Sequence, residues 1–169
     1  MNTETNNTET LAQTAAPVST AQPRLNYRKA SPAAYQAMWA MQTAANNGGL
    51  EKSLMELVKL RASLLNGCAF CIDMHFRSAK AAGEREERLV LLSAWQEARD
   101  LYTARERAAL RWTDALTRLA GNHVSDETFE EVSEHFTDEE MTNLTLAIVA
   151  INGWNRFSVG FAMPVRFQG

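Results

Sequence analysis

The sequence has no apolar run that approaches the roughly 20 residues a membrane-spanning helix requires, so we expect no membrane partner. It also lacks an excess of either charge, because 17 Lys and Arg residues against 20 Asp and Glu residues leave a net charge of −3. This balance gives no electrostatic reason to expect nucleic acid as a partner. No Lys or Arg precedes Arg24, and the apolar segment of a secretory signal is missing. We therefore expect a cytoplasmic protein whose thiols are kept reduced.

Signals for β-strands are missing as well. No Asn-Gly or Asp-Gly pair lies between alternating apolar runs, as a hairpin would require, and no internal repeat indicates a solenoid. Apolar residues recur instead at helical spacings, and their share of 46% is enough to form a core. We predict an all-α bundle of six or seven helices.

Large apolar side chains are nearly absent from residues 1–23, which are rich in Thr, Asn, Ala and Gln. A segment of this composition cannot bury enough surface to offset the conformational entropy lost on ordering. We therefore predict a flexible N-terminal tail over residues 1–23 and a helical domain over residues 24–169. Residues 24–29 are expected to form an extended segment that leads into the first helix.

Capping residues locate the helix ends. Thr103 with Glu106, and Thr137 with Glu140, have the spacing of a capping box, in which each side chain bonds the backbone amide of the other residue. Glycines mark several C-terminal ends, because glycine readily adopts the left-handed conformation found there. These signals predict helices that begin near residues 31, 50, 68, 84, 103, 125 and 137, with a less regular connection over residues 95–102.

Both cysteines of the chain, Cys68 and Cys71, lie three residues apart at the predicted start of one helix. Three residues make nearly one turn, so both thiols share a face and are close enough to pair with modest adjustment. The free N–H groups at a helix N-terminus stabilise a thiolate, which is the nucleophilic form. His75 follows on the same face and can carry a proton near neutral pH.

Glu56 lies one helix earlier, twelve residues before Cys68. If the two helices form an antiparallel hairpin, Glu56 can face the thiols and His75. The alternative is an edge residue that is solvated or paired with Lys52 or Lys59 on its own helix.

The series of Glu56, eleven residues, and then Cys68-x-x-Cys71-x-x-x-His75 resembles the core motif of AhpD-like alkyl hydroperoxidases, in the carboxymuconolactone decarboxylase superfamily. The segments flanking this motif and residues 151–157 are similar too, so that the resemblance covers about residues 30–163. It implies an AhpD-like helical fold and a cysteine-based peroxidase.

Matching the motif residue by residue, the resemblance implies that Cys71 is the peroxidatic cysteine, which attacks the peroxide and becomes a sulfenic acid. Cys68 would resolve this acid to a disulfide, and His75 with Glu56 would form the proton relay. The chain departs from the pattern at Phe70, where well-characterised members carry a second histidine before the second cysteine. A shorter relay or a different pH profile is expected from that change.

The resemblance also implies the partners: a peroxide substrate (hydrogen peroxide or an organic hydroperoxide), a dithiol reductant that the sequence does not identify, and further copies of the chain in a trimer or hexamer. No cofactor and no metal are expected.

Other functions remain open from the residues alone. The same dithiol would serve a thiol–disulfide oxidoreductase or a redox sensor without fast peroxide chemistry. The cysteines could instead be buried packing residues of a non-catalytic binding protein, or two ligands of a structural zinc. Zinc would need two more ligands, and the remaining histidines, His123 and His135, lie far along the chain at polar helix ends. A lactone decarboxylase is a further alternative, although those members of the superfamily typically lack the cysteine pair.

Overall fold

The structure, a computed structural model, describes residues 21–121 and 123–165. Every regular element in these two ranges is a helix, so the all-α prediction is confirmed there. The elements are α1 Tyr27–Ala30, α2 Pro32–Asn46, α3 Lys52–Leu65, α4 Ala69–Ala81, α5 Glu86–Leu91, the 3-10 turns η1 Leu92–Ala94 and η2 Arg99–Leu101, α6 Ala104–Thr117, α7 Asp126–Ser133 and α8 Asp138–Gly160. The predicted flexible tail falls almost wholly on residues 1–20, outside the described ranges.

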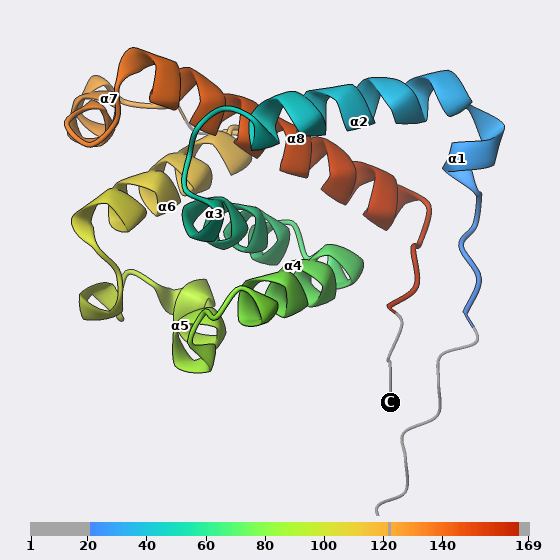
Figure 1. Cartoon of the computed structure of the whole chain (residues 1–169), viewed down its shortest axis with the longest axis horizontal. Coiled ribbons are helices and arrows are strands. Elements are labelled where there is room, and N and C mark those ends of the chain that lie inside the picture. Colours follow the sequence, from blue (N-terminus) through green and yellow to red (C-terminus); the bar gives the residue numbers. More distant parts are fainter. Residues whose placement is uncertain (1–20, 122, 166–169) are drawn as a thin grey trace, which may run out of the picture.

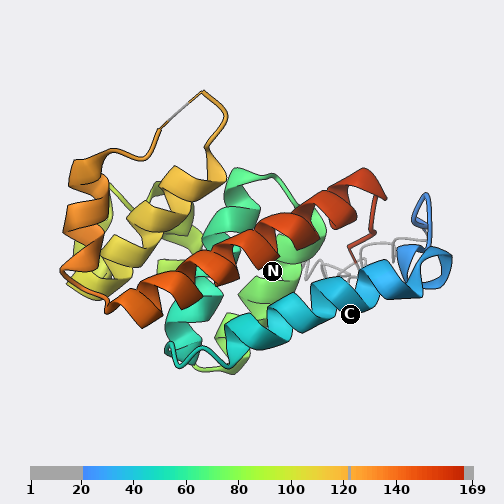
Figure 2. The same cartoon turned by 90° about the horizontal axis from the view of Figure 1, so that it is seen from above.

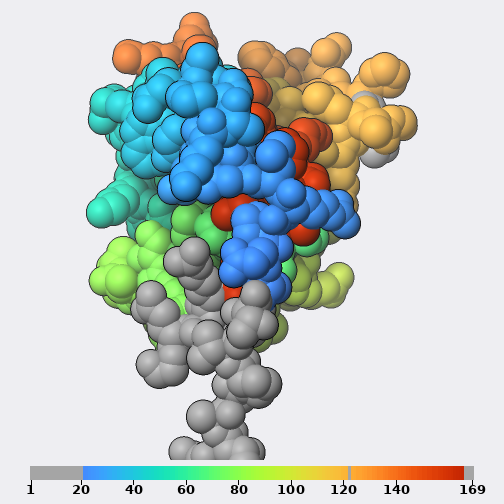
Figure 3. Space-filling model, turned by 90° about the vertical axis from the view of Figure 1, so that its right-hand side faces the viewer, coloured from blue at the N-terminus to red at the C-terminus, as the bar shows by residue number. Residues whose placement is uncertain are grey.

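Helix α3 lies at the centre of the bundle (Figure 1), in contact with α4, α6 and α8. Helix α2 runs along α8 on the outside, as the view from above makes clear (Figure 2). Figure 3 shows the end of the molecule where α1 and α2 cover part of α8. Because α3 is surrounded, its residues 54–63 are all buried, including four that carry charged or hydroxyl groups.

The apolar core has two parts, one on each side of α3. The first lies between α3, α6, α7 and α8 and includes Val58, Trp112 and Leu144. The second lies between α3, α4 and the α5 region and includes Leu57 and Leu92. Each buried aliphatic side chain of this kind stabilises the fold by about 1.5–3 kcal/mol relative to an exposed one.

Both predicted capping boxes are present. Thr103 and Glu106 bond one another's backbone amides at the start of α6, and Thr137 and Glu140 do the same at the start of α8. Gly67 has a φ of 63° between α3 and α4, which is the left-handed conformation expected of a glycine there.

Several predicted boundaries were wrong. The lead-in expected to be extended contains the four-residue helix α1, and helix α6 ends at Thr117. The spacing of apolar residues in the sequence predicts that the helix beginning at Thr103 continues through Leu119, but Leu119 lies beyond α6 and is 54% exposed. With α1 included, the described ranges hold eight α-helices, more than the predicted six or seven. No helix in the described ranges is both long enough and apolar enough to cross a membrane.

Candidate active site

The turn between α3 and α4 places the two cysteines. The Cys68 amide donates to the carbonyl of Ser63 at 3.0 Å, which closes α3 and fixes where α4 begins. Cys68 is the N-cap of α4 and Cys71 lies in its first turn. Their Cα atoms are 5.3 Å apart and the sulfur atoms form a disulfide. The prediction that the two thiols can pair is confirmed.

The disulfide is buried, since Cys68 and Cys71 are each 1% exposed. The sulfur of Cys68 accepts the capping hydrogen bond from the Cys71 amide at 3.4 Å. An amide donor at a helix N-terminus favours a negative charge on the atom it faces. The site therefore supplies direct stabilisation to a thiolate on Cys68, in addition to the positive end of the α4 dipole that both residues share.

Glu56 and His75 meet across the α3–α4 hairpin, as the antiparallel arrangement predicted. His75 Nδ1 lies 2.9 Å from Glu56 Oε2, and both residues are less than 9% exposed. Helix α4 carries His75 one turn beyond Cys71, at the i, i+4 spacing that puts both on one face. The other ring nitrogen, Nε2, is buried and has no hydrogen-bond partner among the described residues.

The second carboxylate oxygen of Glu56 faces Lys59. The ammonium of Lys59 lies 3.3 Å from Glu56 Oε1 and 3.1 Å from Asn46 Oδ1. Burial raises the pKa of Glu56, but the hydrogen bond and charge of His75 and the charge of Lys59 outweigh it, so the net pKa lies below its ordinary value. Glu56 is consequently ionised at neutral pH, and His75 Nδ1 carries the proton that it donates to the carboxylate.

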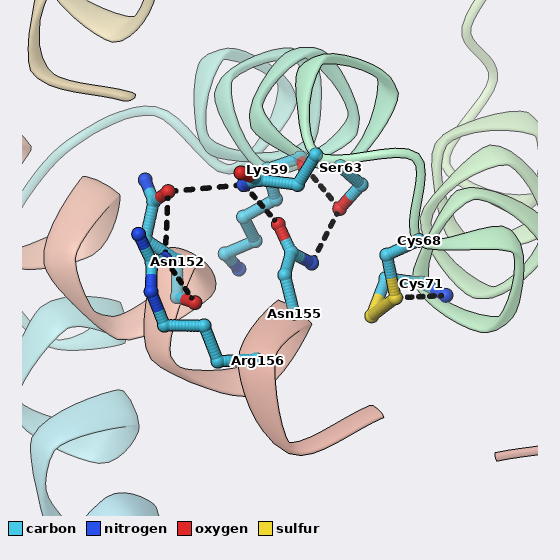
Figure 4. Close-up of a disulfide and its surroundings, with 8 residues drawn as sticks. Lys59, Ser63, Cys68, Cys71, Asn152, Asn155 and Arg156 are labelled. Atoms are coloured by element: carbon cyan, nitrogen blue, oxygen red, sulfur yellow. Dashed lines mark hydrogen bonds between the residues drawn. A yellow bond between two sulfur atoms is a disulfide. The ribbon is translucent and has the colours of Figure 1, made fainter. Parts of the chain in front are cut away.

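A network of amide side chains that the sequence did not predict lies beside the disulfide (Figure 4). Asn66 donates to Asn152 Oδ1 at 3.0 Å and to Asn155 Oδ1 at 2.8 Å. Asn155, 1% exposed, donates to Ser63 Oγ at 3.1 Å. The network ties α8 to the end of α3 and so holds the cysteine turn. Its signal in the sequence is a pair of Asn residues three apart, Asn152 and Asn155, within the segment 151–157 that resembles the family.

The structure does not bring the other two histidines to this site. His135 belongs to the α7–α8 connection, and His123 follows α6. In the part of the chain that the structure describes, no group of three His, Cys, Asp or Glu side chains has the arrangement of a metal site. A cavity of about 330 Å³ lies elsewhere, between the η1–α6 region and α7, and its lining includes Arg107, Arg111 and Glu131. None of its lining residues is one of the predicted site residues Glu56, Cys68, Cys71 and His75.

The chain is similar to known proteins over most of its length. Residues 32–115 match the model of the carboxymuconolactone decarboxylase family. A curated relative, the uncharacterized protein YdfG of Bacillus subtilis, is 38% identical over 136 residues, which are 80% of this chain and 92% of YdfG.

Two further relatives carry AhpD in their descriptions. A solved structure from Agrobacterium tumefaciens, a protein of unknown function described as a candidate antioxidant defence protein AhpD, has 44% identity and a TM-score of 0.84. The match covers 87% of this chain and all of that one. The alkyl hydroperoxide reductase AhpD of Bradyrhizobium diazoefficiens is 49% identical over 41 residues, only 24% of this chain and 22% of that protein.

Proposed function

This chain belongs to the carboxymuconolactone decarboxylase family, with an AhpD-like fold, and we propose that it is a cysteine peroxidase that reduces hydrogen peroxide or small organic hydroperoxides. The observation that carries the proposal is the combination of a closed Cys68–Cys71 disulfide with a buried Glu56–His75 hydrogen bond one helical turn beyond Cys71. A disulfide within a CxxC turn is the product that such a reaction leaves.

In the first step the Cys71 thiolate attacks one oxygen of the hydroperoxide O–O bond. The bond breaks, the sulfur is oxidised to sulfenic acid, and the alkoxide leaves and takes up a proton to become the alcohol. In the second step the Cys68 thiolate attacks the Cys71 sulfur, and hydroxide leaves as water after protonation. Two thiols and one hydroperoxide thus give one disulfide, one alcohol and one water.

His75 transfers the protons in these steps, and Glu56 stabilises its charged form. With Nδ1–H bonded to the Glu56 carboxylate, the free lone pair of His75 is on Nε2, the buried nitrogen that has no partner in the described part of the chain. Nε2 accepts the thiol proton, and the carboxylate stabilises the resulting imidazolium. The same proton is then returned to the leaving oxygen.

A dithiol reductant completes the cycle by thiol–disulfide exchange. The burial of both sulfur atoms favours small reactants, because a folded protein disulfide could not reach a residue that is 1% exposed without local opening of the turn. This observation favours the peroxidase over a general thiol–disulfide oxidoreductase, the second candidate.

The test follows consumption of tert-butyl hydroperoxide with dithiothreitol as reductant. We expect turnover by the wild type, none above background by Cys71→Ser, and slower turnover by Cys68→Ser, in which dithiothreitol itself must reduce the Cys71 sulfenic acid. Absence of turnover by the wild type, or unchanged turnover by Cys71→Ser, would overturn the proposal. Faster oxidation of the reduced protein by a small disulfide than by the peroxide would select the second candidate.

A further inference from the structure

Lys59 is a buried lysine without an assigned role. Its side chain is 9% exposed on the central helix α3, where an ammonium is costly to bury unless it is paired. The sequence alone places Lys59 only among two lysines that can pair with Glu56 at the edge of the helix. In the structure it lies inside, three residues after Glu56 on the same helix.

The two oxygens of the Glu56 carboxylate have separate partners. Oε1 accepts from the Lys59 ammonium at 3.3 Å, and Oε2 lies 2.9 Å from His75 Nδ1. The ammonium is itself held from the other side by Asn46 Oδ1 at 3.1 Å. Gln42 donates to that same oxygen at 2.9 Å, which fixes the orientation of the Asn46 amide. A continuous polar chain therefore runs from α2 through Lys59 and Glu56 to His75 on α4.

We propose that Lys59 is a positioning residue, which holds Glu56 ionised and aimed at His75 and so sets the pH range in which the relay works. The predicted effect of Lys59 on turnover rests on the proposed peroxidase function, whereas its predicted effect on the Glu56 carboxylate does not. Lys59 acts through the Glu56 carboxylate and not directly on a sulfur atom or on the substrate.

Two other cations, Arg61 and Arg156, have partners of their own. The charged groups that act on the carboxylate are Lys59 from α3 and His75 from α4, and the neutral amide of Asn46 on α2 contacts the Lys59 ammonium. Arg61 of α3 is engaged by Asp114 of α6 in a two-bond ion pair. The Arg156 guanidinium of α8 bonds Asn152. Without Lys59, the buried carboxylate keeps its desolvation cost and loses the ammonium that faces Oε1, so it takes up a proton at higher pH.

The direct test measures the titration of the Glu56 carboxyl by ¹³C NMR in the reduced wild type, Lys59→Met and Lys59→Arg. We expect Lys59→Met to titrate at least about one pH unit higher than the wild type, which corresponds to a tenfold change in proton affinity. Lys59→Arg keeps the charge and is expected to stay close to the wild type. Lys52→Met, which removes an exposed lysine from the same helix, is the matched control and should change nothing.

The second readout is the pH profile of kcat/KM for tert-butyl hydroperoxide. Its acid limb should move upward in Lys59→Met by the shift that NMR measures, with rescue by Lys59→Arg. If Lys59→Met has the same Glu56 titration and the same pH profile as the wild type, the inference is overturned. If the wild-type protein shows no turnover, only the peroxidase proposal is overturned, because the NMR titration still decides the role of Lys59. Lys59→Gln, a neutral residue that can still donate, provides the same comparison if Lys59→Met fails to give a wild-type melting curve.

Discussion

At the scale of single residues, the environment of Glu56 sets its chemistry. The carboxylate is buried, yet its pKa lies below the ordinary value, because the hydrogen bond and charge of His75 and the charge of Lys59 outweigh the desolvation that raises it. A depressed pKa means that Glu56 contributes stability above about pH 4.5, its ordinary value, and that this contribution is lost as the pH falls through the lowered pKa.

Glu56→Gln tests both consequences, because the amide has the shape of the carboxylate without its charge. At neutral pH we expect peroxide turnover to fall by about 10²-fold or more, the lower end of what a positioned acid–base group supplies. The stability difference between wild type and variant, from urea unfolding, should be constant above about pH 5 and shrink below it. A difference that does not depend on pH would contradict the ionised, paired state of Glu56.

The sequence predicted some of these contacts and missed others for a physical reason. The meeting of Glu56 and His75 follows from a tight turn at Gly67, which the glycine itself signals. The burial of Lys59 does not follow, because Glu56, Lys59 and Ser63 form a polar stripe at helical spacing, and such a stripe ordinarily faces solvent. Here α2 and α8 supply Asn46 and Asn155, which cover the stripe and bond to it.

At the scale of elements, a buried ion pair joins α3 to α6. Arg61 donates to both oxygens of Asp114 at 2.6 and 2.8 Å, and its remaining donors reach the carbonyls of Leu92 and Ser93 in η1. Trp95 also donates to Asp114. One guanidinium therefore fastens three elements, and the η1 region, which has little regular structure of its own, depends on it.

Asp114→Ala would leave the Arg61 guanidinium buried without its counter-charge. We expect a loss of about 3–5 kcal/mol in the free energy of unfolding, the usual cost of breaking a buried pair by removing one partner. Glu131→Ala is the matched control: it breaks the exposed pair with Arg111 and should cost about 0–1 kcal/mol. Equal losses in the two variants, measured by chemical denaturation, would show that the buried pair does not fasten the elements.

The starts of the long helices α6 and α8 were predictable from their capping residues, whereas α1 was not, although the Asn26 side chain caps it. The capping boxes of α6 and α8 follow from local sequence. The short helix α1 does not, because four residues cannot form a stable helix alone. Its Tyr27 is buried, and the ring packs against those of Tyr35, Phe157 and Phe161, which come from α2 and the end of α8.

At the scale of the whole molecule, the all-α class follows from helical periodicity and from the lack of strand signals. The arrangement of the helices around α3 could not be derived from periodicity, which indicates that a face is buried but not which partner covers it. The assembly into a homo-oligomer stays a prediction. Exposed apolar side chains such as Trp39 on α2 and Val159 on α8, 53% and 52% exposed, are compatible with a subunit contact.

The two cysteines differ in their surroundings, and this difference bears on which of them attacks the peroxide. The motif assigns the attack to Cys71, whereas the capping hydrogen bond stabilises a thiolate on Cys68. In the proposed reaction the Cys68 thiolate is the resolving nucleophile, which attacks the sulfenic acid once it has formed on Cys71.

The most direct measurement is therefore peptide mass spectrometry of Cys68→Ser and Cys71→Ser after one equivalent of tert-butyl hydroperoxide in the presence of dimedone, which traps sulfenic acids. We predict a dimedone adduct on Cys71 in the Cys68→Ser variant and no adduct on Cys68 in the Cys71→Ser variant. An adduct on Cys68 alone, or on neither cysteine, would contradict the account.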